Sequence, residues 1–102
     1  MKLDHIAINV KNISESLKYY IQIGAKTLYY DETWAMIEMG ESKIALTTKS
    51  EHKPHIAFRV LSEQDVSKFG KVKSHRDGSL YTYCEDFDGN TIEWIYYPDK
   101  VN

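Results

Sequence analysis

The chain has 102 residues, of which 42% are hydrophobic and 27% charged, and its formal net charge at pH 7 is −2. This length predicts one domain, residues 1–102, because domains commonly have about 100–150 residues. The balanced charge, with no basic stripe, argues against a nucleic-acid partner. The apolar runs are too short to span a bilayer, the N-terminus does not resemble a signal peptide, and one cysteine makes no internal disulfide. We therefore expect a cytoplasmic protein without a membrane partner.

An internal repeat organises the sequence. Residues 5–10 read His-Ile-Ala-Ile-Asn-Val and residues 55–60 read His-Ile-Ala-Phe-Arg-Val. Large apolar residues occupy every second position in both hexamers, which is typical of strands with one apolar face. His5 and His55 therefore occupy matching positions on the less apolar face of two equivalent strands.

Each hexamer precedes a helical segment. The first has Asn12 or Ser14 as its N-cap and ends at Gly24, and the second begins with the capping-box-like segment 62–65 and ends at Gly70. Three strand-like stretches follow each helix, so each half is predicted to be a βαβββ module, with modules at about 1–49 and 50–102. The expected strands cover roughly 25–31, 33–39 and 43–48 in the first half, and 71–75, 79–84 and 91–97 in the second.

Glu93 stands in the middle of the last predicted strand, between Ile92 and Trp94. A carboxylate among apolar residues is costly unless it is paired or coordinates an ion. With His5 and His55 it forms a donor set of two imidazoles and one carboxylate. That set suits Fe, Mn, Zn, Ni or Co as a divalent ion and leaves coordination positions open for a substrate. Each residue alone is more often structural, so the spacing alone leaves both interpretations open.

Three segments together resemble the vicinal oxygen chelate superfamily, which includes glyoxalase I, extradiol dioxygenases, fosfomycin-resistance proteins and bleomycin-binding proteins. They are residues 3–10, residues 54–60, and residues 85–93, which resemble the family's Asp-Pro-Asp-Gly-Asn-x-Ile-Glu turn and strand with Phe87 in place of the proline. The resemblance implies an α+β fold in which two tandem βαβββ modules form a curved, cavity-enclosing mixed sheet. It also implies that His5, His55 and Glu93 are metal ligands.

One departure narrows the implied function. Glyoxalase I has a fourth, carboxylate ligand on the last strand of its first module, and aligning residues 43–46 with residues 91–94 puts Ala45 at that position. The resemblance thus implies a metal-dependent enzyme of the dioxygenase-like or fosfomycin-modifying type, acting on a small oxygen-rich molecule, rather than glyoxalase I. It also implies a homodimer. The candidate substrate contacts are Asn9, Arg59, Tyr81 and Tyr83.

Two alternatives remain open from the sequence. The chain is a metal-independent binding protein of the bleomycin type, which its many aromatic residues favour, or it keeps the three residues as structural hydrogen-bonding partners. His52 and His75 lie in charged, loop-like stretches. We expect both to be exposed and outside the site.

Overall fold

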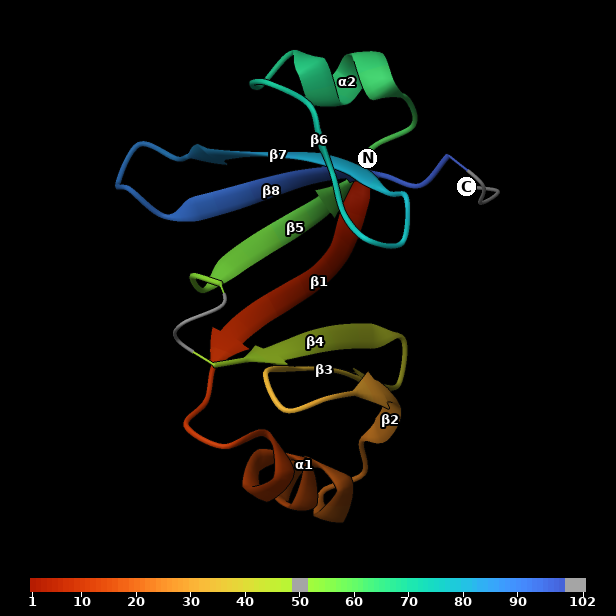
Figure 1. The fold of residues 1–102 in the computed structure, drawn as a ribbon, viewed down its shortest axis with the longest axis vertical. Coiled ribbons are helices and arrows are strands. Elements are labelled where there is room, and N and C mark those ends of the chain that lie inside the picture. Colours follow the sequence, from red (N-terminus) through yellow and green to blue (C-terminus); the bar gives the residue numbers. More distant parts are fainter. Residues whose placement is uncertain (49–51, 99–102) are drawn as a thin grey trace. The chain divides into compact units, whose positions relative to one another are not determined.

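The structure is a computed structural model that describes residues 1–48 and 52–98 (Figure 1). The chain divides into two compact units. The N-terminal unit is His5–Pro54, and the C-terminal unit comprises Met1–Asp4 and His55–Asn102. The predicted module boundary, between residues 49 and 50, lies outside the described residues. Within those residues, no helix combines the length and apolarity needed to cross a membrane.

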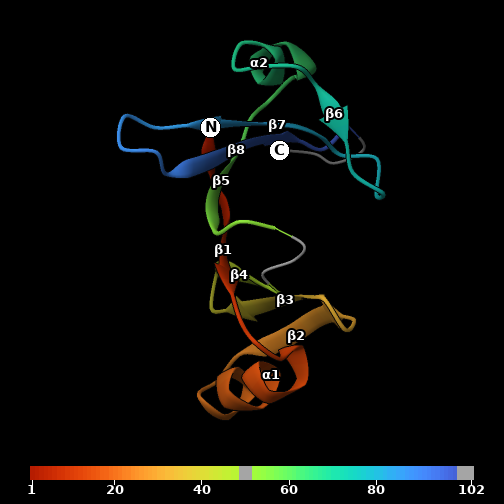
Figure 2. The same cartoon turned by 60° about the vertical axis from the view of Figure 1, so that its left-hand side comes forward.

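The first βαβββ module has its strands in the sheet order β2-β3-β4-β1. β1 is parallel to β4, whereas β3 is antiparallel to both of its neighbours. α1 packs on β2, β3 and β4 (Figure 2). The elements are β1 (Lys2–Asn9), α1 (Ile13–Gln22), β2 (Lys26–Tyr30), β3 (Trp34–Met39) and β4 (Ser42–Thr47).

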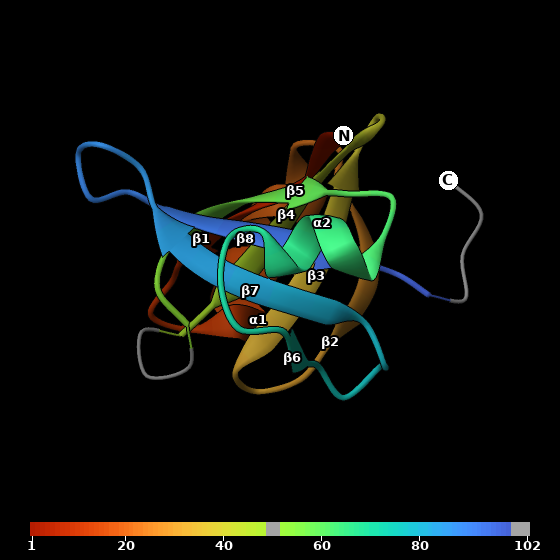
Figure 3. The same ribbon diagram turned by 90° about the horizontal axis from the view of Figure 1, so that it is seen from above.

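The second module repeats this arrangement, with the sheet order β5-β8-β7-β6. β5 is parallel to β8 and the other pairs are antiparallel. α2 packs on β7 and β8 (Figure 3). The predicted fold class, α+β with two tandem βαβββ modules of mixed strand direction, is confirmed, although the expected strand 71–75 contracts to two residues. The elements are β5 (His55–Arg59), α2 (Glu63–Ser67), β6 (Lys73–Ser74), β7 (Leu80–Glu85) and β8 (Thr91–Tyr96).

Side-chain caps start both helices. The Asn12 side chain accepts a hydrogen bond of 2.9 Å from the Glu15 backbone N–H, so Asn12 rather than Ser14 is the N-cap of α1. Ser62 accepts the equivalent bond from the Asp65 backbone N–H at 3.2 Å. Each cap satisfies one of the N–H groups that the first helical turn leaves without an intrahelical partner.

Removing the α1 cap is expected to destabilise the protein modestly. Asn12→Ala should lower the free energy of unfolding by about 1 kcal/mol, because it leaves the Glu15 N–H without its acceptor. Ser14→Ala is the matched control and should change stability by less than half of that. Urea unfolding followed by circular dichroism measures both. Equal effects of the two substitutions would contradict the assignment of Asn12 as the cap.

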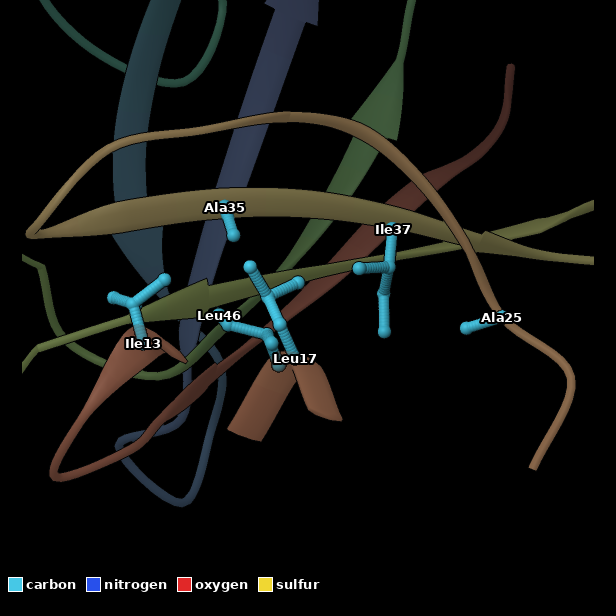
Figure 4. Close-up of a cluster of buried hydrophobic side chains, with 6 residues drawn as sticks. All are labelled: Ile13, Leu17, Ala25, Ala35, Ile37 and Leu46. Carbon is cyan, nitrogen blue, oxygen red and sulfur yellow. The ribbon is translucent and has the colours of Figure 1, made fainter. Parts of the chain in front are cut away.

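An apolar cluster between α1 and the strands holds the first module together (Figure 4). Ile13 and Leu17 are one helical turn apart, so both point from α1 toward β3 and β4. Burial of these side chains stabilises α1 on the sheet. The cluster consists of Ile13, Leu17, Ala25, Ala35, Ile37 and Leu46.

An aromatic stack performs the same function in the second module. The Trp94 ring on β8 lies 4.0 Å from the Phe69 ring and 5.3 Å from the Phe58 ring on β5, measured between centroids. Its indole N–H lies 3.2 Å from Cys84 Sγ on β7. Because successive side chains of a strand point to opposite faces, this stack fixes one face of β8 and leaves Glu93 on the other.

The first strand of each module is buried on the face that carries its histidine. His5 and Ala7 are buried, whereas Ile6 between them is 41% exposed. In the second module, His55 and Ala57 are buried and Ile56 is 37% exposed. Period-2 alternation correctly predicted which residues share a face. It did not reveal that the less apolar face is the more buried one at the start of each strand.

Candidate metal centre

Glu93 occupies the middle of β8 and is almost completely buried, with 2% of its surface exposed. In the sheet it pairs with Ala57 of β5 on one side and with Tyr83 of β7 on the other. Ala57 presents only a methyl group. The His55 side chain, two residues earlier on the same face of β5, therefore reaches the carboxylate.

Two imidazoles contact the Glu93 carboxylate, one at each oxygen. His55 Nε2 lies 3.3 Å from Oε1, and His75 Nε2 lies 2.7 Å from Oε2. Burial by itself would raise the pKa of Glu93, but the hydrogen bonds and positive charge of His55 and His75 outweigh it and lower that pKa to about 2. The site therefore holds an ionised carboxylate at neutral pH.

His75 corrects the sequence-based expectation, which placed it exposed and outside the site. Its side chain is only 28% exposed and bonds to Glu93. The turn between β6 and β7 brings it there: the His75 backbone N–H donates to the Ser79 carbonyl at 2.9 Å, and Asp77 Oδ1 accepts from both the backbone N–H and the hydroxyl of Ser79. Arg76-Asp77-Gly78 predicted the turn, but no local signal showed which strand position the histidine would face.

Tyr81 and Tyr83, both predicted substrate contacts, lie between the two histidines on one face of β7. The His75 ring stacks on the Tyr81 ring with centroids 3.7 Å apart and an interplanar angle of 8°. Tyr81 contacts Tyr83 edge to face at 5.2 Å, and Tyr83 contacts His55 in the same manner at 5.4 Å. Burial, with the negative charge of Glu93, raises the pKa of Tyr83 above its ordinary value. Tyr83 is therefore a neutral phenol that can donate a hydrogen bond.

Arg59 is on the same face of β5 as His55, further along the strand. Its guanidinium carbon lies 4.8 Å from the centroid of the Tyr97 ring, a cation–π contact. The Tyr97 hydroxyl donates a 2.9 Å hydrogen bond to Asp4 Oδ2. Arg59 Nε and Nη2 are buried and make no hydrogen bond with the described residues. These N–H groups suit an oxyanion.

Two further predicted residues belong to the N-terminal unit. His5 is buried, with 4% of its surface exposed. Asn9 uses its amide N–H groups within the unit, donating to Thr47 Oγ1 and to the His52 carbonyl, both at 2.9 Å. Asn9 therefore ties the end of β1 to the segment that follows β4.

The strand registers confirm that Ala45 is the counterpart of Glu93. Ala45 on β4 pairs with Ala7 on β1, as Glu93 pairs with Ala57 in the other module. Its other neighbour, on β3, is Met36. Ala7, Met36 and Ala45 form a buried apolar cluster. The first module therefore offers no carboxylate at this position.

The donors of the C-terminal unit fit a divalent ion. Two ligand atoms, each about 2.0–2.1 Å from a tetrahedrally coordinated ion, lie about 3.3–3.4 Å apart. His55 Nε2 and Glu93 Oε1 have this separation, 3.3 Å. Both side chains are buried, and an imidazole with an ionised carboxylate is a donor combination typical of zinc and its neighbours in the first transition series.

The lowered pKa of Glu93 makes the metal-free protein sensitive to acid. Because the folded-state pKa of about 2 lies below the ordinary 4.5, the ionised carboxylate stabilises the fold above pH 4.5. This stabilisation is lost as the pH falls from 4.5 through about 2, and it corresponds to about 3 kcal/mol. Chemical unfolding with a chelator present, at pH 7 and pH 3, measures the part already lost at pH 3, about 2 kcal/mol. Glu93→Gln should lack this part of the pH dependence, and an identical dependence in the variant would contradict the prediction.

Known proteins share the family and the fold of this chain. The sequence model of the Glyoxalase/Bleomycin resistance protein/Dioxygenase superfamily matches residues 2–94. A hypothetical protein from Bacillus halodurans C-125 is similar in structure, with a TM-score of 0.79 and 22% identity over 99% of this chain and 97% of that one. A methylmalonyl-CoA epimerase variant from Streptomyces coelicolor, in complex with 2-nitronate-propionyl-CoA, has a TM-score of 0.79 and 15% identity over 100% and 98%. No curated protein matches the chain. At these identities the structural similarity demonstrates a shared fold.

Proposed function

We propose that this chain, which belongs to the Glyoxalase/Bleomycin resistance protein/Dioxygenase superfamily, is a divalent-metal-dependent enzyme that acts on a small oxygen-rich molecule. His5, His55 and Glu93 hold the ion. One observation carries the proposal: a buried, ionised carboxylate lies 3.3 Å from a buried imidazole nitrogen, the separation of two donors to one ion.

His5 is proposed as the third ligand on two grounds. It is the repeat counterpart of His55, and like His55 it is buried. Two imidazoles and one carboxylate suit Fe, Mn, Zn, Ni or Co and leave coordination positions for a substrate.

The apolar surroundings of Ala45 favour a dioxygenase-like or fosfomycin-modifying reaction over that of glyoxalase I. Alanine neither ligates an ion nor accepts a proton, and neighbouring Ala7 and Met36 supply no substitute. When bound, a divalent ion supplies Lewis-acid polarisation of substrate oxygens. The chain itself supplies the ligands and the groups that orient the substrate.

Four side chains are proposed to contact the substrate: Asn9, Arg59, Tyr81 and Tyr83. Tyr83 is suited to donate a hydrogen bond, because it keeps its proton beside the Glu93 charge. Arg59 is suited to a carboxylate, phosphate or phosphonate, through its two buried N–H groups. The half-buried Tyr81 ring, stacked on His75, presents an apolar surface beside these groups.

Binding of a bidentate oxygen chelator tests the proposal. Acetohydroxamic acid is added to the Co(II)-loaded protein and to the chelator-treated protein, and the visible absorption of Co(II) and the heat of binding are measured. The proposal predicts saturable binding that perturbs the Co(II) absorption and disappears without metal. Arg59→Ala, which removes a proposed anion contact but no ligand, should still bind Co(II). A loaded protein that fails to bind the probe would contradict an open coordination site.

A metal-independent binding protein is the second candidate, favoured by exposed aromatic residues. Tyr29 and Tyr30 on β2 are 51% and 66% exposed. The Trp34 indole N–H on β3 lies 2.6 Å from the Tyr29 hydroxyl. Such rings can stack on a flat ligand. Quenching of tryptophan fluorescence by bleomycin in the presence of a chelator, lost in Trp34→Phe, would support this function and not the enzyme.

A further inference from the structure

We infer that His75 is a positioning residue that holds one oxygen of Glu93, so that the other oxygen, on the side of His55, would be oriented as the ligand of a metal ion. The inference rests on the proposed function, since it concerns how the ligand carboxylate is oriented. It extends that function to His75, a histidine outside the two repeated hexamers. His75 lies in the connection between β6 and β7, whereas His55 and Glu93 lie on β5 and β8.

The two oxygens of the Glu93 carboxylate have different histidine partners, and this difference carries the inference. His55 Nε2 lies 3.3 Å from Oε1, the separation of two donors that share an ion. His75 Nε2 lies 2.7 Å from Oε2, the separation of a direct, charge-assisted hydrogen bond. An ion held by His55 and Oε1 would leave the His75 hydrogen bond to Oε2 in place. His75 therefore acts through Glu93 and not as a ligand.

The surroundings of His75 fix its ring as a positioning role requires. Tyr81 stacks on the ring at 3.7 Å, nearly parallel to it. The backbone N–H and carbonyl of His75 are both hydrogen-bonded within the turn, to Ser79 and Gly78. These contacts fix the plane of the His75 ring and the position of its backbone, and Nε2 lies within hydrogen-bond distance of Glu93. A carboxylate held at one oxygen loses less conformational entropy when its other oxygen binds an ion.

The affinity for Co(II) tests the inference. Besides His75→Ala, two amide variants, His75→Gln and His75→Asn, differ in the length of the side chain. His75→Ala should bind Co(II) about 10–100-fold more weakly than the parent, the usual effect of removing a group that orients a ligand. His75→Gln carries an N–H the same number of bonds from the backbone as Nε2, so it should recover most of the affinity. His75→Asn is one bond shorter and should not. His52→Ala, at the histidine near Trp34, is the matched control and should bind as the parent does.

The Co(II) absorption spectrum at saturation separates positioning from ligation. A positioning role leaves the set of donor atoms unchanged, so His75→Ala at saturating Co(II) should keep the spectrum of the parent. Parent-like affinity in His75→Ala, or loss of one imidazole donor from its X-ray absorption spectrum, would overturn the inference and leave the proposed function standing. A parent protein that binds no Co(II) would instead overturn the proposed function, and the inference with it. Thermal unfolding of each variant confirms that it is folded.

Discussion

Replacing Glu93 with alanine is expected to abolish stoichiometric metal binding and to destabilise the metal-free protein by about 3 kcal/mol. Both effects arise because Glu93 is 2% exposed, contacts His55 at 3.3 Å and is hydrogen-bonded to His75 at 2.7 Å. Without the carboxylate, the buried His55 and the half-buried His75 lose their ionic partner, and breaking a buried pair by removing one partner costs about 3–5 kcal/mol. Urea unfolding and metal analysis of the same preparations measure the two effects.

Glu93→Gln separates these effects. Glutamine keeps the shape and one carbonyl acceptor but loses the negative charge. It should therefore retain more of the metal-free stability than alanine, while binding a divalent ion far more weakly than the parent. If both variants bound metal as the parent does, Glu93 would not be a ligand.

Introducing a carboxylate at residue 45, the counterpart of Glu93 in the first module, is expected to have the second large effect on stability. Ala45 is completely buried beside Ala7 and Met36, so Ala45→Glu buries a charge among apolar side chains. The expected loss of stability without metal is about 3 kcal/mol or more, from overpacking together with the cost of the charge. Ala45→Gln has the same size without the charge. The difference between the two variants measures the contribution of the charge.

Bound metal should reduce the difference in stability between Ala45→Glu and Ala45→Gln. If the counterpart position shares in the proposed site, the added carboxylate can bind the ion, and saturating Zn(II) should stabilise Ala45→Glu more than Ala45→Gln. An equal effect of Zn(II) on the two variants would show that residue 45 does not reach the ion. A loss below 1 kcal/mol for Ala45→Glu without metal would contradict the apolar packing around Ala45.

The sequence was sufficient to predict the fold because its strongest signals are local and occur twice. The two His-Ile-Ala hexamers lie largely in β1 and β5. Asn12, one of the two caps predicted for the first helix, and Ser62, at the start predicted for the second, form the capping hydrogen bonds. The alignment of Ala45 with Glu93 relied on the same repetition, and the two parallel strand registers agree with it. Repetition of this kind transfers from one module to the other without knowledge of long-range contacts.

The parts of the site that escaped prediction depend on contacts between distant residues. Alternation along a strand shows which residues share a face, but not which face is covered, so the burial of Ala7 and Ala57 and the exposure of Ile6 and Ile56 were not foreseen. His75 is 18 residues from Glu93 and reaches it only because the turn folds β6 back along β7. A histidine in a charged stretch gives no indication of this pairing.

The most direct test of the proposed metal centre is the metal content of the protein purified without an affinity tag, measured by plasma mass spectrometry. Parallel samples of His5→Ala, His55→Ala and Glu93→Ala, each shown to be folded, complete the measurement. The proposal predicts close to one equivalent of Fe, Mn, Zn, Ni or Co in the parent and its loss in all three variants. A parent that stays metal-free after incubation with these ions, or a His5→Ala variant that binds as the parent does, would contradict it.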